Sequence, residues 1–194
     1  VETVRFEDVH YWNEISAILQ DARQTIPSTL GLCWAGFVMA YLEGVNKFNY
    51  DQKLFGVFEL RNLAPDHPIV GELDDVFFCP QSRHAGIPDD AMEKAANDGR
   101  LKLLAYGVEA GYSIFSTADD RFIAHTGHPE YNANRLADEA KRDHGNPDVP
   151  PPVNFDFREP LNRWRSHRNT FFTQWVSYCY LKISNHDMAI RKNL

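Results

Sequence analysis

Hydrophobic residues recur at helical spacing near the start of the chain. Across residues 7–23 the apolar positions lie three or four apart, which predicts an amphipathic helix that Pro27 ends. The apolar run 29–33 predicts a short buried strand, and residues 35–43 predict a helix that stops at Gly44. A helix, a strand and a second helix are therefore expected in immediate succession.

The middle of the chain predicts mainly strands. They cover residues 54–60, 75–79, 101–105, 112–116 and 122–125, with a turn at 117–120 and a helix over 91–96 that Asp89 and Asp90 can cap. A helix from Asn132 or Asn134 to Arg142, a proline-rich loop at 144–152 and an apolar helix over 164–183 complete the pattern. Alternating strands and helices predict an α/β domain with a mostly parallel sheet.

The length of the chain and its first residue bear on how much of the domain is present. The 194 residues suffice for a single domain, 1–194. The strand count is low for a complete sheet, and the chain does not begin with Met. We therefore expect that N-terminal strands of the domain are missing.

Charge and cysteine content exclude several classes of protein. The chain has 27 acidic and 20 basic residues, a net charge of -7, and no basic face of the kind that binds nucleic acid. Its apolar runs are too short for a membrane span, and no export signal is visible. The three cysteines are far apart and fit neither a disulfide framework nor a zinc site, which favours a cytoplasmic protein.

Cys33 is the first candidate for chemistry. It stands where the predicted strand turns directly into a helix, at the carboxyl end of a sheet. The neighbouring helix N-terminus favours the thiolate that attacks carbonyl groups. Taken alone, the position suits a buried structural cysteine slightly better.

His128 and Glu130 are the second candidate. They follow an apolar strand, so the histidine can act as a base and the glutamate can orient its ring. An incidental histidine in a polar loop is the commoner case for such a segment. With Cys33 these residues make a Cys-His-Glu triad, whereas His125 adds only an incomplete metal set with no fourth ligand.

Several cationic side chains are candidates for binding a carboxylate. Arg83 with His84, and Arg142 in its predicted helix, can make charge-assisted hydrogen bonds. A solvated surface charge is the alternative for each. The segment 164–167 is expected to pack and cap rather than to form a site.

Five ordered motifs give these residues a common context. They are residues 28–34 (STLGLCW), 53–57 (KLFGV), 80–83 (PQSR), 126–131 (TGHPEY) and 164–167 (WRSH). In order and spacing the chain resembles the homoserine O-acyltransferase family, the transsuccinylases and transacetylases of methionine biosynthesis, from its first residues to about 183. The resemblance implies a flavodoxin-like, class I glutamine amidotransferase-like three-layer sandwich.

The resemblance also implies roles for single residues. They are Cys33 as nucleophile, Trp34 as oxyanion-hole donor, His128 as general base, Glu130 as its partner, and Lys53, Ser82 and Arg142 as substrate-binding residues. Glu2 matches the position that selects the acyl donor, where Glu is similar to acetyl-CoA users and Gly to succinyl-CoA users. A carboxylate there repels a succinyl group but tolerates an acetyl group.

Two positions differ from the family's pattern. Leu60 and Gln81 stand where members commonly carry histidine, and we expect both to neighbour the amino-acid site. Such a change can suit serine in place of homoserine, because one methylene is worth only about 1–3 kcal/mol in a pocket.

Together these observations predict an acyltransferase that moves an acetyl group from acetyl-CoA to homoserine through an acyl-Cys33 intermediate, with no bound cofactor. Serine O-acetyltransferase and homoserine O-succinyltransferase activities are the alternatives. A glutamine amidotransferase-type hydrolase and a non-catalytic metabolite binder are more distant ones. A cytoplasmic homodimer is expected by default, without nucleic-acid or membrane partners.

Overall fold

The N-terminal elements follow the predicted order. The computed structural model describes residues 1–192, with side chains to residue 184. A short 3-10 turn, η1 (Phe6–Asp8), leads into α1 (Trp12–Thr25), β1 (Thr29–Leu32) and α2 (Trp34–Leu42). The single predicted helix over 7–23 is thus divided in two. Both parts present aromatic and apolar side chains to one cluster, in which Phe6 packs beside Trp12.

The remaining elements complete a six-stranded sheet, which includes β1, and add helices that flank it. They are β2 (Phe48–Asn62), β3 (Val76–Gly86), α3 (Asp89–Asn97), β4 (Leu101–Gly107), β5 (Gly111–Thr117), β6 (Phe122–His125), α4 (Ala133–Arg142) and α5 (Arg165–Lys192). The strand order is β1-β6-β5-β4-β2-β3. Asp89 and Asp90 lie in the first turn of α3, and Pro88 is the N-cap residue in their place.

The expected mostly parallel sheet is wrong in this part of the protein. Only β1 and β6 run parallel, and the other four pairings are antiparallel. The reason lies in the connections, because a parallel crossover needs a dozen or more residues. Residues 108–110 and 118–121 join β4, β5 and β6 as short turns that reverse the chain.

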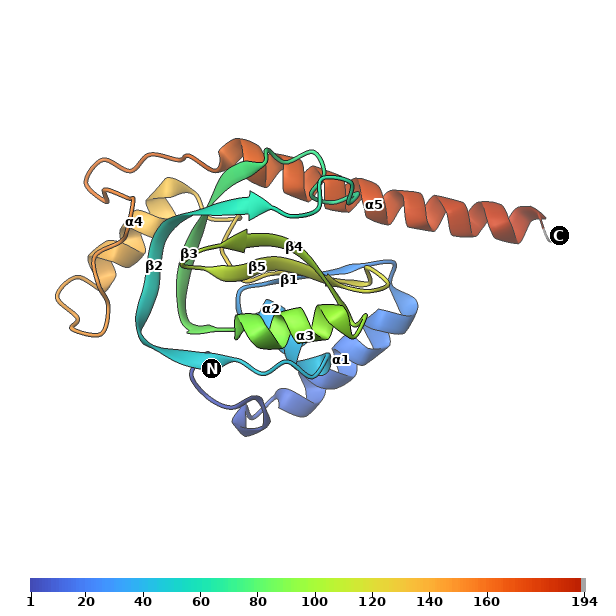
Figure 1. The fold of residues 1–194 in the computed structure, drawn as a ribbon, viewed down its shortest axis with the longest axis horizontal. Coiled ribbons are helices and arrows are strands. Elements are labelled where there is room, and N and C mark those ends of the chain that lie inside the picture. The colour runs from blue at the N-terminus through green and yellow to red at the C-terminus, as the bar shows by residue number, and fades with distance from the viewer. Residues whose placement is uncertain (193–194) are drawn as a thin grey trace.

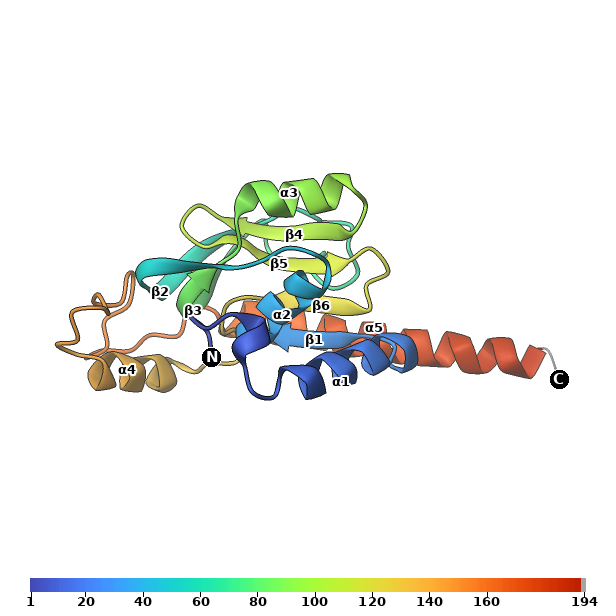
Figure 2. The ribbon, with the colours of Figure 1, turned by 90° about the horizontal axis from the view of Figure 1, so that it is seen from below.

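Both faces of the sheet are covered, which gives the predicted three layers. Along β6, Phe122 and Ala124 face a cluster with α2 and α3, while Ile123 faces a second cluster with α5. This alternation follows from the two-residue period of a strand. Figures 1 and 2 show α5 on one side of the sheet and α1 on another, with the C-terminal end of α5 projecting beyond the body.

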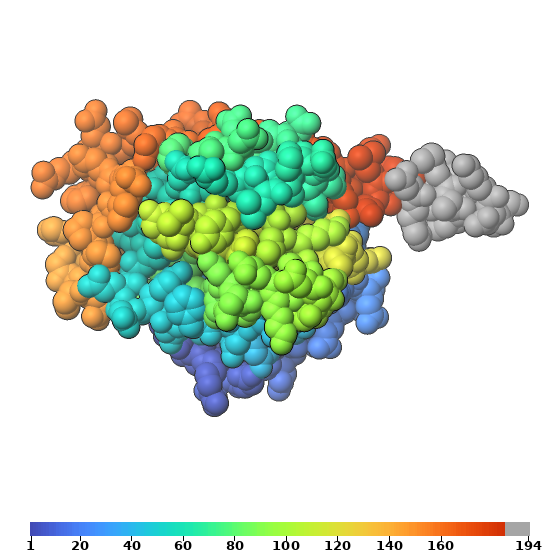
Figure 3. Space-filling model, in the orientation of Figure 1, coloured from blue at the N-terminus to red at the C-terminus, as the bar shows by residue number. Residues whose placement is uncertain are grey.

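A long loop after α4 closes one end of the molecule. Its Val153 forms an isolated parallel bridge to Gly56, and the backbone N–H of Val57 donates to the Val153 carbonyl at 2.9 Å. The orange loop therefore packs against the cyan β2 in the space-filling view (Figure 3). This loop, α4 and β2 together build the end of the molecule that holds the site.

Candidate active site

Cys33 sits on a sharp turn between β1 and α2. Its backbone is at φ 50° and ψ -114°, a conformation that costs a residue with a side chain on the order of 1–3 kcal/mol. The turn is held because the Cys33 N–H donates to the His125 carbonyl at 2.8 Å, continuing the pairing of β1 with β6. This is the geometry of a nucleophile elbow, which lifts a side chain out of the end of a sheet.

Gly31 makes the elbow possible two residues earlier. A Cβ atom there would lie 2.7 Å from Met39 Sδ and 3.0 Å from the Ala35 carbonyl carbon, so α2 packs directly on the strand. The next helix therefore starts at once, and Trp34 is its first residue. A first-turn N–H has no partner within the helix, so the Trp34 amide is a suitable oxyanion donor.

His128 is held by the turn that follows β6. Its N–H donates to the Pro80 carbonyl at 2.8 Å, which ties the turn to β3. Gly127 permits this approach, because a Cβ there would lie 2.7 Å from Gln81 Nε2 and 2.8 Å from the Pro80 carbonyl oxygen. Two different strand ends, of β1 and β6, thus bring Cys33 and His128 together.

The three predicted catalytic side chains lie together. His128 Nδ1 is 2.7 Å from Glu130 Oε1. Burial opposes the charge of the imidazole, but the adjacent Cys33 and Glu130 side chains outweigh it and raise the pKa of His128 to about 9. A protonated imidazole beside a cysteine is the environment that produces a reactive thiolate.

The predicted substrate-binding residues line one pocket of about 270 Å³. It is bounded by Glu2, Lys53, Ser82, His84, Tyr131, Glu139, Arg142, Asp143, Asn146 and Val149. Tyr131 also stacks on His128, with ring centroids 4.2 Å apart. Tyr131 therefore lies both in the pocket lining and against the His128 imidazole.

Acidic residues of α4 and its C-cap neutralise the cations of this pocket. Lys53 Nζ lies 3.0 Å from Asp143 Oδ2 and 3.7 Å from Glu139 Oε2. Arg142 donates to both carboxylate oxygens of Asp143, at 2.6 and 2.7 Å, and together with Lys53 holds the pKa of Asp143 well below its usual range. The pocket thus presents both charges, as a zwitterionic amino acid requires.

Glu139 is a pocket residue that the sequence patterns did not single out. Burial disfavours its charge, but hydrogen bonds from Ser82 and Tyr131 and the charge of Lys53 keep its pKa below the ordinary value. A signal existed in the sequence, since Glu139 shares the buried face of α4 with Leu136 and Ala140. A carboxylate at such a position needs a partner.

Glu2 is anchored at a bulge of the β2–β3 ladder. Between the pairs Asn49–Ala85 and Leu54–Arg83 the register shifts, so β2 does not pair with His84. The Glu2 carboxylate accepts hydrogen bonds there from the backbone N–H groups of His84 at 2.8 Å and Ala85 at 3.3 Å. Its charge is therefore fixed at the wall of the pocket.

Three expectations about neighbouring residues are wrong. Arg83 is buried on the opposite face of β3 from His84 and donates to Gln81, Tyr50 and two backbone carbonyls. Leu60 belongs to the core beneath α5, and Gln81 packs under Gly127; neither lines the pocket. Strand alternation is the reason, because only every second side chain faces the site.

The buried pair under the site is uncharged. Burial raises the pKa of Cys79, and burial with the nearby His128 and Arg83 charges lowers the pKa of His125 to about 3.

Among the described residues no group of three or more His, Cys, Asp or Glu could hold a metal ion, and no helix is long and apolar enough to cross a membrane.

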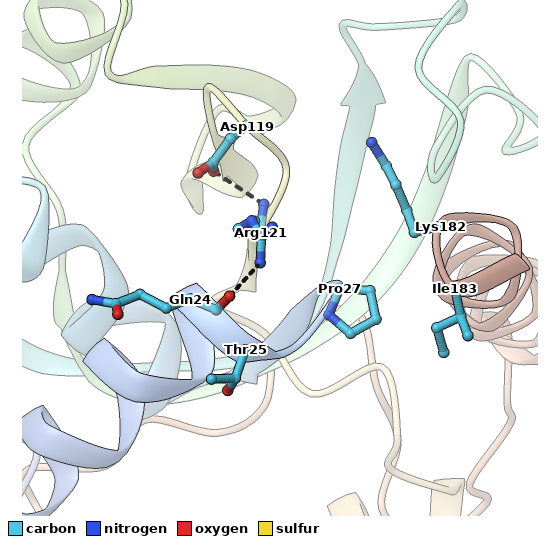
Figure 4. Close-up of a pocket in the computed structure, with 7 residues that line it drawn as sticks. All are labelled: Gln24, Thr25, Pro27, Asp119, Arg121, Lys182 and Ile183. Carbon is cyan, nitrogen blue, oxygen red and sulfur yellow. Dashed lines mark hydrogen bonds between the residues drawn. The ribbon is translucent and has the colours of Figure 1, made fainter. Parts of the chain in front are cut away.

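A second pocket lies at the other end of β1 and β6. Arg121 lines it, and its guanidinium donates to the carbonyls of Arg23, Gln24 and Ile26 at the end of α1. Figure 4 shows the hydrogen bond to Gln24. Lys182 and Ile183 of α5 form the far wall. Arg121 therefore satisfies backbone carbonyls at the C-terminal end of α1, where Ile26 is the C-cap residue.

The family model described as homoserine O-succinyltransferase matches residues 1–185. The homoserine O-succinyltransferase of Proteus mirabilis is 36% identical over 193 residues, covering 96% of this chain and 62% of that protein. The homoserine O-acetyltransferase of Thermotoga petrophila is 36% identical over 186 residues, covering 92% and 60%. The chain thus spans about 60% of the length of these curated relatives.

A solved glutamine amidotransferase from Thermotoga maritima superposes with a TM-score of 0.66 at 11% identity, covering 94% of this chain and 74% of that one. This likeness confirms the predicted amidotransferase-like α/β fold. Together with the family match over nearly the whole chain, it leads to one conclusion. The chain belongs to the homoserine O-succinyltransferase family.

Proposed function

We propose that this protein transfers an acyl group to the hydroxyl of homoserine, with Cys33 as the acyl carrier. The observation that carries the proposal is the alignment of Cys33, His128 and Glu130 beside a pocket of mixed charge. The relatives' names give homoserine as acceptor but differ in the donor. Acetyl-CoA is the proposed donor, because the anchored Glu2 carboxylate disfavours a succinyl group.

The first half-reaction uses the ion pair of Cys33 and His128. The thiolate attacks the thioester carbonyl, and the Trp34 N–H donates to the oxyanion. The carbon–sulfur bond to CoA then breaks, and His128 gives its proton to the departing sulfur. The products are free CoA, acetyl-Cys33 and a neutral imidazole.

The second half-reaction follows from the change of charge. Acylation removes the thiolate, so His128 loses the partner that favoured its proton and becomes a base. It takes the proton of the homoserine hydroxyl while the oxygen attacks acetyl-Cys33. Collapse releases O-acetylhomoserine and restores the ion pair, with Glu130 orienting the ring throughout.

CoA release from acetyl-CoA, with homoserine and serine compared, tests this proposal. Cys33→Ala should abolish turnover, and mass spectrometry of the wild-type chain should find an added acetyl group on the peptide containing Cys33. Turnover by Cys33→Ala would refute the assignment. Ammonia release from glutamine without CoA release would favour the amidotransferase-type hydrolase that the fold also accommodates.

Glu2→Gly tests the donor. Removing the carboxylate frees the His84 and Ala85 N–H groups, so the ratio of succinyl-CoA to acetyl-CoA turnover should rise roughly tenfold or more. An unchanged ratio would refute the role of Glu2.

A cytoplasmic location and a homodimer stay predictions; the three free cysteines agree with a reducing setting.

A further inference from the structure

Tyr131 belongs to the lining of the proposed amino-acid pocket and also contacts His128. Its ring stacks on the His128 imidazole with the planes 22° apart and the centroids 4.2 Å apart. A protonated imidazole facing an aromatic ring gains a cation–π attraction, and a neutral one does not. The ring therefore influences both the orientation and the charge of His128.

The hydroxyl of the same side chain reaches into the pocket. It donates to Glu139 Oε1 at 2.8 Å, while Ser82 Oγ donates to the other carboxylate oxygen at 2.5 Å. Glu139 in turn is 3.7 Å from Lys53 Nζ. One side chain thus contacts the imidazole with its face and the charged pocket with its tip.

Two hydrogen bonds hold the backbone of Tyr131 in place. The indole Nε1–H of Trp164 donates to the Tyr131 carbonyl at 2.7 Å, and Trp164 is only 1% exposed. The Tyr131 N–H donates to the His128 carbonyl at 3.1 Å. Two motifs distant in sequence, 126–131 and 164–167, therefore meet in one support for the ring.

We propose that Tyr131 is a positioning residue that couples the amino-acid pocket to the catalytic base. Its ring holds the imidazole plane and favours the protonated form, and its hydroxyl keeps the Glu139 carboxylate in place for the substrate. The coupling rests on the proposed function. The other charged or titratable groups facing this unit are Cys33, Glu130 and buried His125 around His128, and Arg135 around Tyr131.

Tyr131→Phe tests the hydroxyl in the full chain. A hydrogen bond to a carboxylate is lost but the stacked ring remains, so KM for homoserine should rise roughly tenfold, with a smaller effect on the rate of Cys33 acetylation. Tyr112→Phe is the matched control, because the Tyr112 hydroxyl also donates to a glutamate, Glu93 Oε1, over 3.0 Å. Neither Tyr112 nor Glu93 lines the pocket. That variant should leave both quantities unchanged.

Tyr131→Leu tests the ring by a measurement that needs no turnover. The His128 resonance, identified by its loss in His128→Gln, is titrated by NMR in histidine-labelled protein. Without the stacking ring the His128 midpoint should fall by roughly half a pH unit, and in Tyr131→Phe it should stay at the wild-type value.

The two readouts separate the possible failures. An unchanged KM in Tyr131→Phe, or an unchanged His128 midpoint in Tyr131→Leu, overturns the coupling. Absence of homoserine acylation in the wild-type chain overturns the proposed function, and the NMR titration still decides the role of the ring. If Tyr131→Leu does not fold, the KM comparison of the two Phe variants decides the proposal.

Discussion

The charge of His128 illustrates how neighbours set chemistry at the residue scale. A histidine at this depth would ordinarily lose its proton, yet Cys33 and Glu130 raise its pKa to about 9. His125, three residues earlier and fully enclosed, has a pKa lowered to about 3. At neutral pH His128 is therefore protonated and His125 is neutral, and the difference comes from the Cys33 and Glu130 side chains beside His128.

This difference predicts a dependence of stability on pH. The folded pKa of His128 lies above the ordinary 6.5, so its contribution is fully present below about pH 6.5 and is lost as pH rises through about 9. The gap in free energy of unfolding between wild type and His128→Gln should be at most about 3 kcal/mol and should shrink over that window. Urea denaturation across pH measures it.

Exposed His10 provides the control for that measurement. His10→Gln should give a small gap in free energy of unfolding that does not follow the same window. A gap for His128→Gln that stayed constant from pH 6 to about 9.5 would contradict the raised pKa.

At the scale of elements, helix α4 and its C-cap contribute Glu139, Arg142 and Asp143 to the pocket. Its inward face bears Glu139, and the helix ends at Arg142 with Asp143 as C-cap. Its start is fixed by Asn132, whose Oδ1 accepts the Arg135 N–H at 2.8 Å. The sequence offered Asn132 or Asn134 as the helix start, and the structure selects the first.

Replacing the cap therefore predicts a specific loss. Asn132→Ala should lower the free energy of unfolding by about 1 kcal/mol, because the first turn of α4 loses a hydrogen-bond acceptor. Asn134→Ala, on the exposed side of the same turn, should change it by less than about half a kcal/mol. Equal effects of the two substitutions in thermal or urea unfolding would argue against the assigned cap.

At the scale of the whole molecule, α5 joins distant parts of the chain. Phe171 is 2% exposed and its ring meets the His125 ring edge-on at 5.5 Å, so α5 packs directly beneath the strand that leads to His128. The indole N–H of Trp164, just before α5, donates to the Tyr131 carbonyl. Helix α5 thus packs against the strand that positions His128.

Truncating that contact should destabilise the protein. Phe171→Ala should lower the free energy of unfolding by roughly 3–5 kcal/mol, since it leaves a cavity in the core. Tyr180→Ala on the same helix should have little effect, because Tyr180 is 69% exposed. A loss below about 1 kcal/mol for Phe171→Ala would show that α5 does not hold this face of the sheet.

The local elements and the candidate catalytic residues could be predicted from the sequence alone. Periodicity located the strands and helices, because burial of an apolar face imposes its period on the chain, and the Cys33 turn followed from a strand directly before a helix. The motifs identified His128, Glu130 and the pocket residues Lys53, Ser82 and Arg142, which the structure gathers at one end of the sheet.

Only the tertiary structure decided strand direction and the residues that link the site. Direction depends on which strands become neighbours, and short connections reversed most of them. The roles of Tyr131, Glu139 and Trp164 depend on contacts between segments far apart in sequence, which local spacing does not encode. Arg83 shows the same limit, because the face of a strand that meets the core is set by what packs against it.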